Sequence, residues 1–220
     1  MNDTTPKNSI KELLKEYPEM ILGRYASYWY YKTPRRMVHS LSYYKFAAKL
    51  IGKKKRILDV GCNEGLGTWL LSKECGYALG FDFDEEAIQT AKANFQHPNI
   101  AFAQGDILKE SPKGTWDAVV NFDVIEHIYP DHVDQFMEAL KHNLTNQGLV
   151  IIGTPSLISQ EFASEMSKKG HVNIYSHGQL EEMMRRHFEY VFMFAANDEV
   201  VHTGYLPLAH YFITVGVKKK

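Results

Sequence analysis

Short apolar runs alternate with amphipathic stretches from Arg56 to the end of the chain. This alternation is typical of βαβ units, which build a largely parallel sheet. The predicted strands are Ile57–Val60, Tyr77–Phe81, Ile100–Ala103, Ala118–Asn121, Leu149–Gly153, Tyr190–Phe194 and His210–Val217. The predicted helices are Gly67–Glu74, Glu85–Phe95, His132–Leu144 and His177–Arg186. Because the polar stretch Asn197–Leu208 fits a hairpin-like return, we expect an α/β fold with a mostly parallel, seven-stranded sheet and one antiparallel edge strand.

The first fifty residues follow a different pattern. Ile10–Tyr17 and Met37–Ile51 carry apolar residues at helical spacing, and a stretch dense in aromatic residues joins them. We expect residues 1–52 to form a helical extension on the substrate side, acting as a lid within the same domain as residues 53–220. Its aromatic side chains either pack on the core or line a pocket, and they are Tyr25, Tyr28, Trp29, Tyr30, Tyr31, Tyr43 and Tyr44.

Composition and charge narrow the class of protein. With 220 residues and 45% apolar composition, the chain can bury one sizeable core, which predicts a single domain. The formal net charge is −1, so no long-range field draws the protein to nucleic acid or to a membrane surface, and we expect neither as a partner. The basic clusters Lys53–Arg56 and Lys218–Lys220 flank apolar runs and fit the solvated ends of strands.

The N-terminal residues predict a cytoplasmic protein. They lack the charged-then-apolar order of a signal peptide, and no apolar run approaches the ~20 residues that span a bilayer. The two cysteines, Cys62 and Cys75, have neither metal-ligand spacing nor a disulfide framework, so we expect small buried side chains. We expect a monomer or a homodimer.

The densest motif is a buried strand that runs into a glycine-rich turn and then a helix, from Ile57 to Thr68. Gly61 and Gly65 allow a tight turn and a close approach of the backbone to a ligand, while the helix start presents free N–H groups. Such a turn also binds dinucleotides, or it serves structure alone. Asp82 ends the next strand about twenty residues later, where an acid can accept both ribose hydroxyls and disfavours a 2′-phosphate.

Two further polar positions follow predicted strands. Asp106 comes after the third strand and Asn121 ends the fourth. Because the carboxyl ends of parallel strands meet at one edge of the sheet, these side chains and the glycine loop are expected to share a ligand site. A nicotinamide dinucleotide predicts Gly-x-Gly-x-x-Gly, whereas this loop reads Gly-Cys-Asn-Glu-Gly-Leu-Gly, so hydride transfer is disfavoured.

On these motifs the chain resembles the class I S-adenosylmethionine-dependent methyltransferases, especially the methyltransferase-11-like and ubiquinone-biosynthesis-like group, over roughly residues 56–153. The acid-x-Gly-x-Gly-x-Gly loop of that family corresponds to Asp59, Gly61, Asn63 and Gly65, and asparagine tolerates the left-handed backbone of the replaced glycine. The resemblance implies a Rossmann-like three-layer sandwich with S-adenosylmethionine as cofactor. It assigns the methionine portion to Asp59, Gly61, Cys62, Asn63 and Gly65, the ribose to Asp82, the adenine to Phe83, Asp106 and Ile107, and the sulfonium side to Asn121 or Phe122.

The stretch after the fourth strand brings a carboxylate and an imidazole to the reacting end. Glu126 and His127 follow that strand directly, and His171 precedes a helix whose expected cap is Ser176. By the resemblance, a histidine at the position of His171 faces the pocket. Either imidazole can take a proton from a hydroxyl acceptor, and Glu126 can tune or orient His127. Each histidine also has a purely structural interpretation.

The same residues allow a metal site. Asp123, Glu126, His127 and His171 offer oxygen and nitrogen ligands that suit Mn²⁺, Zn²⁺ or Fe²⁺ better than Mg²⁺. Because Glu-His pairs also occur in metal-free relatives, a divalent metal is possible but not favoured.

Residues near the pocket point to the acceptor. The aromatic extension and the polar, histidine-containing stretch Ala195–Tyr205 suit a sugar, nucleotide-sugar or phenolic natural-product intermediate, with that stretch either lining the pocket or forming a solvated turn. We expect O-methylation of such a small molecule. The alternatives are N-methylation of a small amine, or a non-catalytic cofactor-binding subunit.

Overall fold

The computed structural model describes residues 6–53, 55–142 and 144–220. Residues 1–5 of the expected extension, residue 54 of the first basic cluster and residue 143 of the predicted helix 132–144 lie outside the described residues.

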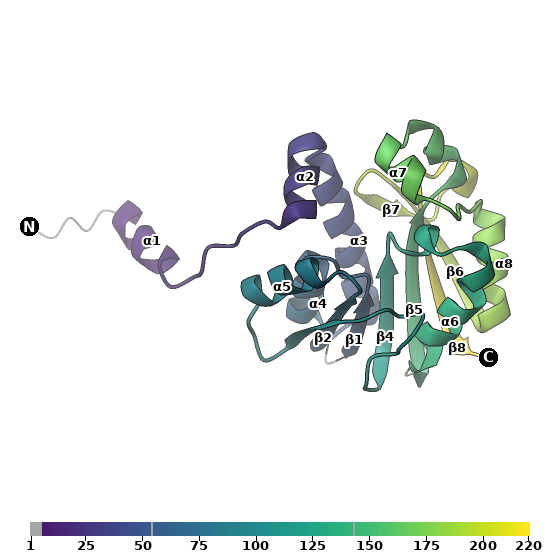
Figure 1. Ribbon diagram of the computed structural model, residues 1–220, viewed down its shortest axis with the longest axis horizontal. Helices are drawn as coiled ribbons and strands as arrows, with labels where there is room; N and C mark the ends of the chain where they lie inside the picture. The colour runs from purple at the N-terminus through teal and green to yellow at the C-terminus, as the bar shows by residue number, and fades with distance from the viewer. Residues whose placement is uncertain (1–5, 54, 143) are drawn as a thin grey trace, which may run out of the picture.

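The centre of the fold is an eight-stranded sheet within the described residues (Figure 1), in the order β3-β2-β1-β4-β5-β8-β6-β7. The strands are β1 Arg56–Val60, β2 Tyr77–Asp82, β3 Ile100–Gln104, β4 Trp116–Phe122, β5 Leu144–Pro155, β6 Phe188–Asn197, β7 Val200–His202 and β8 Tyr211–Lys219. Strands β1 to β5 pair in parallel, whereas β8 is antiparallel to β5 and β6, and β7 is antiparallel at the edge. The α/β class and the antiparallel edge strand are confirmed. The eighth strand is the short β7, inside the stretch where the sequence predicted only a return.

Helices cover both faces of the sheet. They are α1 Pro6–Leu14, α2 Arg24–Lys32, α3 Arg35–Ile51, α4 Leu66–Glu74, α5 Glu85–Asn94, α6 Val133–His142, α7 Glu165–Gly170 and α8 His177–His187, with 3₁₀ turns η1 Ile125–His127, η2 Pro130–His132, η3 Leu157–Phe162 and η4 Leu206–Leu208. Side chains alternate between the faces, so Leu58 packs in the core beneath α6 and α8, while its neighbour Ile57 packs beneath α3 and α4. This is the expected three-layer sandwich.

Two helices begin at a residue whose side chain caps the helix N-terminus. Asp84 accepts hydrogen bonds from the N–H groups of Glu86 and Ala87 and caps α5. Ser176 and Gln179 form a capping box at the start of α8, as the cap at Ser176 predicted.

The N-terminal extension divides into three parts. Helix α3 belongs to the core through Tyr43, Tyr44 and other buried side chains. The aromatic stretch, expected only as part of a helical extension, forms α2. Helix α1 stands away from the body (Figure 1), and its residues Ile10 and Leu13 are exposed. Among the described residues, none of the helices has the length and apolar character needed to cross a membrane.

Outside the site, the remaining expectations concern the cysteines and the basic clusters. Cys62 is buried and Cys75 half-buried, and both are free thiols. Burial raises the pKa of each thiol, which keeps both protonated and unreactive at neutral pH. The described lysines of the two basic clusters lie at strand ends, and most are exposed, as expected.

Candidate functional site

A cavity of about 410 Å³ lies at the carboxyl ends of β1 and β4. The glycine loop forms one wall, α2 and α3 form another, and α7 with the residues after β4 closes the far end. The lining residues used below are Tyr25, Ala26, Trp29, Arg36, Tyr44, Gly61, Cys62, Asn63, Glu64, Phe122, Asp123, His127, Gly170 and His171.

The glycine loop has the left-handed backbone that its sequence predicted. The φ angles are 77° at Gly61, 49° at Asn63 and 81° at Gly65. A Cβ at Gly61 would lie 2.1 Å from the Val124 side chain, so only glycine fits there. Asn63 replaces the family's middle glycine without loss of the conformation, and its side chain accepts the N–H of Glu64 at 2.7 Å.

Asp82 holds the loop from the end of β2. Its carboxylate accepts the N–H of Asn63 at 2.8 Å and the N–H of Asp84 at 3.0 Å. Burial raises the pKa of this carboxyl. Asp82 therefore joins the glycine loop to the start of α5, at the position where the sequence placed a ribose ligand.

The residues expected around adenine lie at the neighbouring ends of β2 and β3, outside the cavity. Phe83 is 75% exposed, which is high for a large apolar side chain. Asp106 accepts the N–H of Leu108 and pairs with Lys109 at 3.0 Å, which lowers the pKa of its carboxyl. Ile107 is buried. Of these three residues, Phe83 therefore presents an exposed apolar ring and Asp106 a partly exposed acid.

Asp59 is not among the residues that line the cavity. Its carboxyl is fully buried and accepts hydrogen bonds from Thr68 at 2.6 Å and from the Tyr44 hydroxyl at 3.1 Å. Burial raises its pKa to about 7, against the two hydrogen bonds. Asp59 thus fixes Tyr44, whose ring lines the cavity.

Of the two residues expected under the sulfonium, only Phe122 lines the cavity. Asn121 is fully buried and donates from its amide to the carbonyl of Val60 at 2.9 Å, while its side-chain oxygen has no partner among the described residues. Asn121 therefore ties β4 to β1 beneath the loop.

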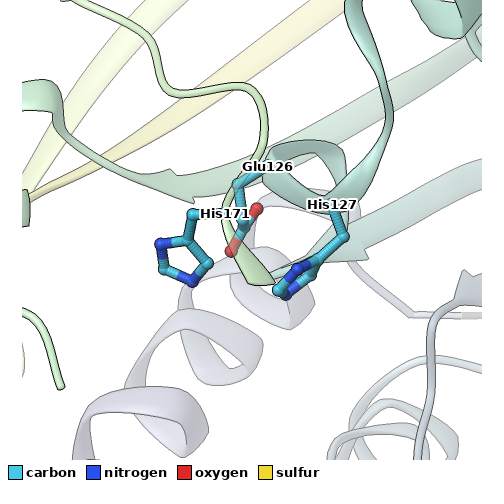
Figure 2. Close-up of side chains that lie close together, drawn as sticks. All are labelled: Glu126, His127 and His171. Atoms are coloured by element: carbon cyan, nitrogen blue, oxygen red, sulfur yellow. The ribbon is translucent and has the colours of Figure 1, made fainter. Parts of the chain in front are cut away.

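His127 and His171 lie together at the far end of the cavity (Figure 2), held there by hydrogen bonds to two backbone carbonyls. The carbonyl of Glu126 accepts the N–H groups of Val172 and Asn173, which anchors the chain after α7 against η1. The Nδ1–H of His127 donates to the carbonyl of Gly170 at 2.8 Å. The two imidazole rings then lie 5.1 Å apart, with Glu126 beside them.

The same contact fixes the tautomer of His127. A carbonyl oxygen can only accept, so the proton is on Nδ1 and a neutral His127 presents a lone pair at Nε2. His171 contacts the Gln160 side-chain oxygen through Nδ1 at 2.8 Å. Burial, and then the neighbouring His127, lower the pKa of His171 to about 4, so this ring is neutral at pH 7.

Glu126 is buried and only half satisfied. One carboxyl oxygen accepts the Thr154 hydroxyl at 3.0 Å, and the other has no partner within the described residues. Burial, and then Asp123, raise its pKa to about 8. The ligand atoms of Glu126, His127 and His171 lie within 4.8 Å of one another, so three of the four candidate metal ligands form a cluster. Asp123 lines the same cavity outside that cluster.

Sequence reasoning missed Arg36, the only lysine or arginine among the described residues that line the cavity. Its guanidinium stacks on Trp29 at 4.4 Å and lies 3.5 Å from the Asp123 carboxylate. The spacing of Arg36, Ser40 and Tyr44 on one helical face was the available signal. The stretch 195–205 does not contribute to the lining; it forms the end of β6 and β7.

Comparison with known proteins agrees with this arrangement. The methyltransferase domain family matches residues 28–189. The chain is 28% identical over 157 residues to the probable S-adenosylmethionine-dependent methyltransferase of Mycolicibacterium smegmatis, covering 70% of this chain and 56% of that protein. It is 27% identical over 161 residues to the ubiquinone biosynthesis O-methyltransferase of Xylella fastidiosa, covering 67% of this chain and 63% of that protein. The chain thus spans about half to two thirds of these curated relatives. The solved DhpI–SAH complex shares the fold, with a TM-score of 0.64 at 17% identity, covering 86% of this chain and 89% of that chain.

Proposed function

Because this chain belongs to the class I S-adenosylmethionine-dependent methyltransferases, we propose that it transfers the methyl group to a hydroxyl oxygen of a small molecule. The observation that carries the proposal is the pair of imidazoles at the end of the cavity opposite the glycine loop, one of which presents its Nε2 lone pair.

The residues at the strand ends fit the cofactor. The left-handed loop exposes backbone to the cavity, Phe83 offers an uncovered ring for the adenine, and Asp82 lies between them for the ribose. Arg36 supplies the positive charge that the methionine carboxylate needs. When bound, the cofactor supplies a methyl group on a positively charged sulfur.

The chain itself contributes alignment and a proton acceptor. The walls formed by Trp29, Tyr44 and Phe122 exclude water and orient an acceptor. His127 Nε2 takes the hydroxyl proton, and Gly170 holds the imidazole in that tautomer. A cavity of about 410 Å³ lies in the range of ~300–1,000 Å³ typical of small-molecule sites, which favours a metabolite over a macromolecule.

The test is a panel of sugars, nucleotide sugars, phenolics and small amines, scored by release of S-adenosylhomocysteine. Turnover of hydroxyl compounds supports the proposal. Turnover of amines alone replaces it with N-methylation, and binding without turnover of any class favours a cofactor-binding subunit.

A second candidate is metal-assisted transfer, favoured by the buried oxygen of Glu126 that lacks a partner among the described residues. Glu126, His127 and His171 would hold a divalent ion such as Mn²⁺ or Zn²⁺, which would lower the pKa of an acceptor hydroxyl. The carbonyl of Gly170 orients the His127 ring for this role as well. Loss of turnover in chelator with recovery in Mn²⁺ would select this candidate; turnover unaffected by chelator would select the base.

A further inference from the structure

Glu64 belongs to the glycine loop, but its side chain binds the N-terminal end of α2. It is 5% exposed, and its two carboxylate oxygens accept the N–H groups of Tyr25 at 2.8 Å and Ala26 at 2.7 Å. These are first-turn N–H groups, which have no partner inside a helix. The N-cap residue of α2 is Gly23, which has no side chain to satisfy them. Glu64 therefore acts as the cap of a helix 38 residues distant in sequence.

The absence of a side chain at position 23 makes room for this carboxylate. A Cβ at Gly23 would lie 2.0 Å from Glu64 Oε1, and the three nearest heavy atoms all belong to Glu64. The φ angle of Gly23 is −72°, which any residue adopts, so its backbone imposes no need for glycine. A methyl group there would meet the Glu64 side chain first and displace it from the helix.

Besides this cap, α2 is held by Trp29, which stacks on the guanidinium of Arg36 in α3, and by a few weaker contacts. Ala26 is its one buried residue. Two exposed contacts assist, from the Tyr25 hydroxyl to Asp84 at 2.9 Å and from Arg24 to Glu86 at 3.3 Å, and exposed contacts of this kind contribute weakly. A segment with so few buried apolar contacts opens locally at low cost. The Glu64 carboxylate, whose charge the helix dipole favours at this position, is thus the main contact between α2 and the glycine loop.

Helix α2 supplies part of the cavity wall. Tyr25, Ala26 and Trp29 line it, and the Trp29 ring carries the guanidinium of Arg36. The carboxylate of Glu64 therefore connects the glycine loop to α2. Through Trp29, α2 in turn positions the guanidinium of Arg36.

We propose that Glu64 is a positioning residue that latches α2 over the cavity and so sets how long the cofactor is retained. This rests on the proposed function only in placing the cofactor against the glycine loop. Closing α2 also places Trp29, whose ring stacks on Arg36, so the latch couples cofactor retention to the placement of a wall that orients the acceptor.

The test is a double-mutant cycle between Glu64→Ala and Gly23→Ala, with Glu64→Gln as the conservative variant, in the full-length chain. The readouts are the dissociation rate of S-adenosylhomocysteine and trypsin cleavage after Arg24 and Lys32, both exposed. Each single alanine variant should raise the dissociation rate on the order of tenfold, the scale of losing a helix cap. In each, bound S-adenosylhomocysteine should no longer protect α2 from trypsin. Glu64→Gln, which keeps one acceptor oxygen, should fall between these variants and the wild type.

The cycle separates a latch from a loss of stability. In the double variant the shortened side chain at position 64 leaves room for the new methyl group, so its dissociation rate should equal that of Glu64→Ala alone. Two results would refute the latch without affecting the proposed cofactor site. In one, the two substitutions multiply each other's effect on the dissociation rate; in the other, the dissociation rates equal that of the wild type. A wild-type chain that does not bind S-adenosylhomocysteine would overturn both.

Discussion

Replacing Asp59 with asparagine should remove a pH dependence of stability. The folded-state pKa of about 7 lies about three units above the ordinary value of 3.8, because the carboxyl is buried. The unfolded chain therefore releases its proton first as pH rises, and stability falls at roughly 1.4 kcal/mol per unit until the folded carboxyl also ionises near pH 7. The stabilisation by the neutral form is complete below about pH 4 and lost above about pH 7.

The matched assay is urea unfolding of the wild type and Asp59→Asn at pH 5 and pH 8. The amide oxygen can accept the Thr68 hydroxyl and the amide nitrogen can donate to the Tyr44 hydroxyl oxygen, as a protonated carboxyl can, so the variant keeps both contacts and lacks only the titration. Taking the difference between the two proteins cancels every other titrating group. Relative to the variant, the wild type should lose roughly 2–3 kcal/mol between these pH values.

Two results would refute this reasoning. A difference between the proteins that does not change with pH would mean that Asp59 titrates normally. A large loss of S-adenosylhomocysteine affinity in Asp59→Asn would mean that the residue contacts the cofactor, contrary to its position behind Tyr44.

Further predictions concern the ribose acid, the adenine edge and the two imidazoles. Asp82→Ala should weaken S-adenosylhomocysteine binding by roughly 1.5–3 kcal/mol in calorimetry, while Asp106→Asn should cost less because its amide oxygen still accepts; unchanged affinity in Asp82→Ala would put the ribose elsewhere. His127→Ala should keep cofactor affinity and lose turnover by roughly 10²–10⁴-fold, with partial rescue at high pH for a hydroxyl acceptor. If His171→Ala loses as much turnover as His127→Ala, and a chelator lowers the turnover of the wild type to the same level, the imidazoles are metal ligands instead of a base.

The sequence predicted those parts of the fold that depend on neighbouring residues. The strand, glycine turn and helix around Gly61, and the cap at Ser176, follow from local backbone chemistry. Residues 1–52 were expected to form a helical extension, but the bounds of α2 were not predicted, because five of its nine residues are aromatic and lie on all sides of the helix. The strand β7 is three residues long, too short for a pattern to register.

The sequence predicted which residues belong to the site, but not which atoms contact one another. His127 and His171 were expected near each other, yet the tautomer of His127 depends on a carbonyl 43 residues away. The resemblance to the methyltransferase family assigned Asp59 to the methionine portion, but only tertiary packing places its carboxyl against the Tyr44 hydroxyl. Arg36 enters the cavity only because α3 presents that face to the loop. Such contacts arise between distant segments, so a local pattern such as the spacing of Arg36, Ser40 and Tyr44 marks a helical face but not what that face contacts.

Thermal melting with S-adenosylhomocysteine and with NAD tests the central claim, that this cavity is built for the methyl donor. S-adenosylhomocysteine at about a hundred times its dissociation constant should stabilise the fold by ~2.7 kcal/mol, which raises the melting temperature by roughly 5–10 °C for a chain of this size. NAD should leave the melting temperature unchanged. A shift with NAD and none with S-adenosylhomocysteine would contradict the account.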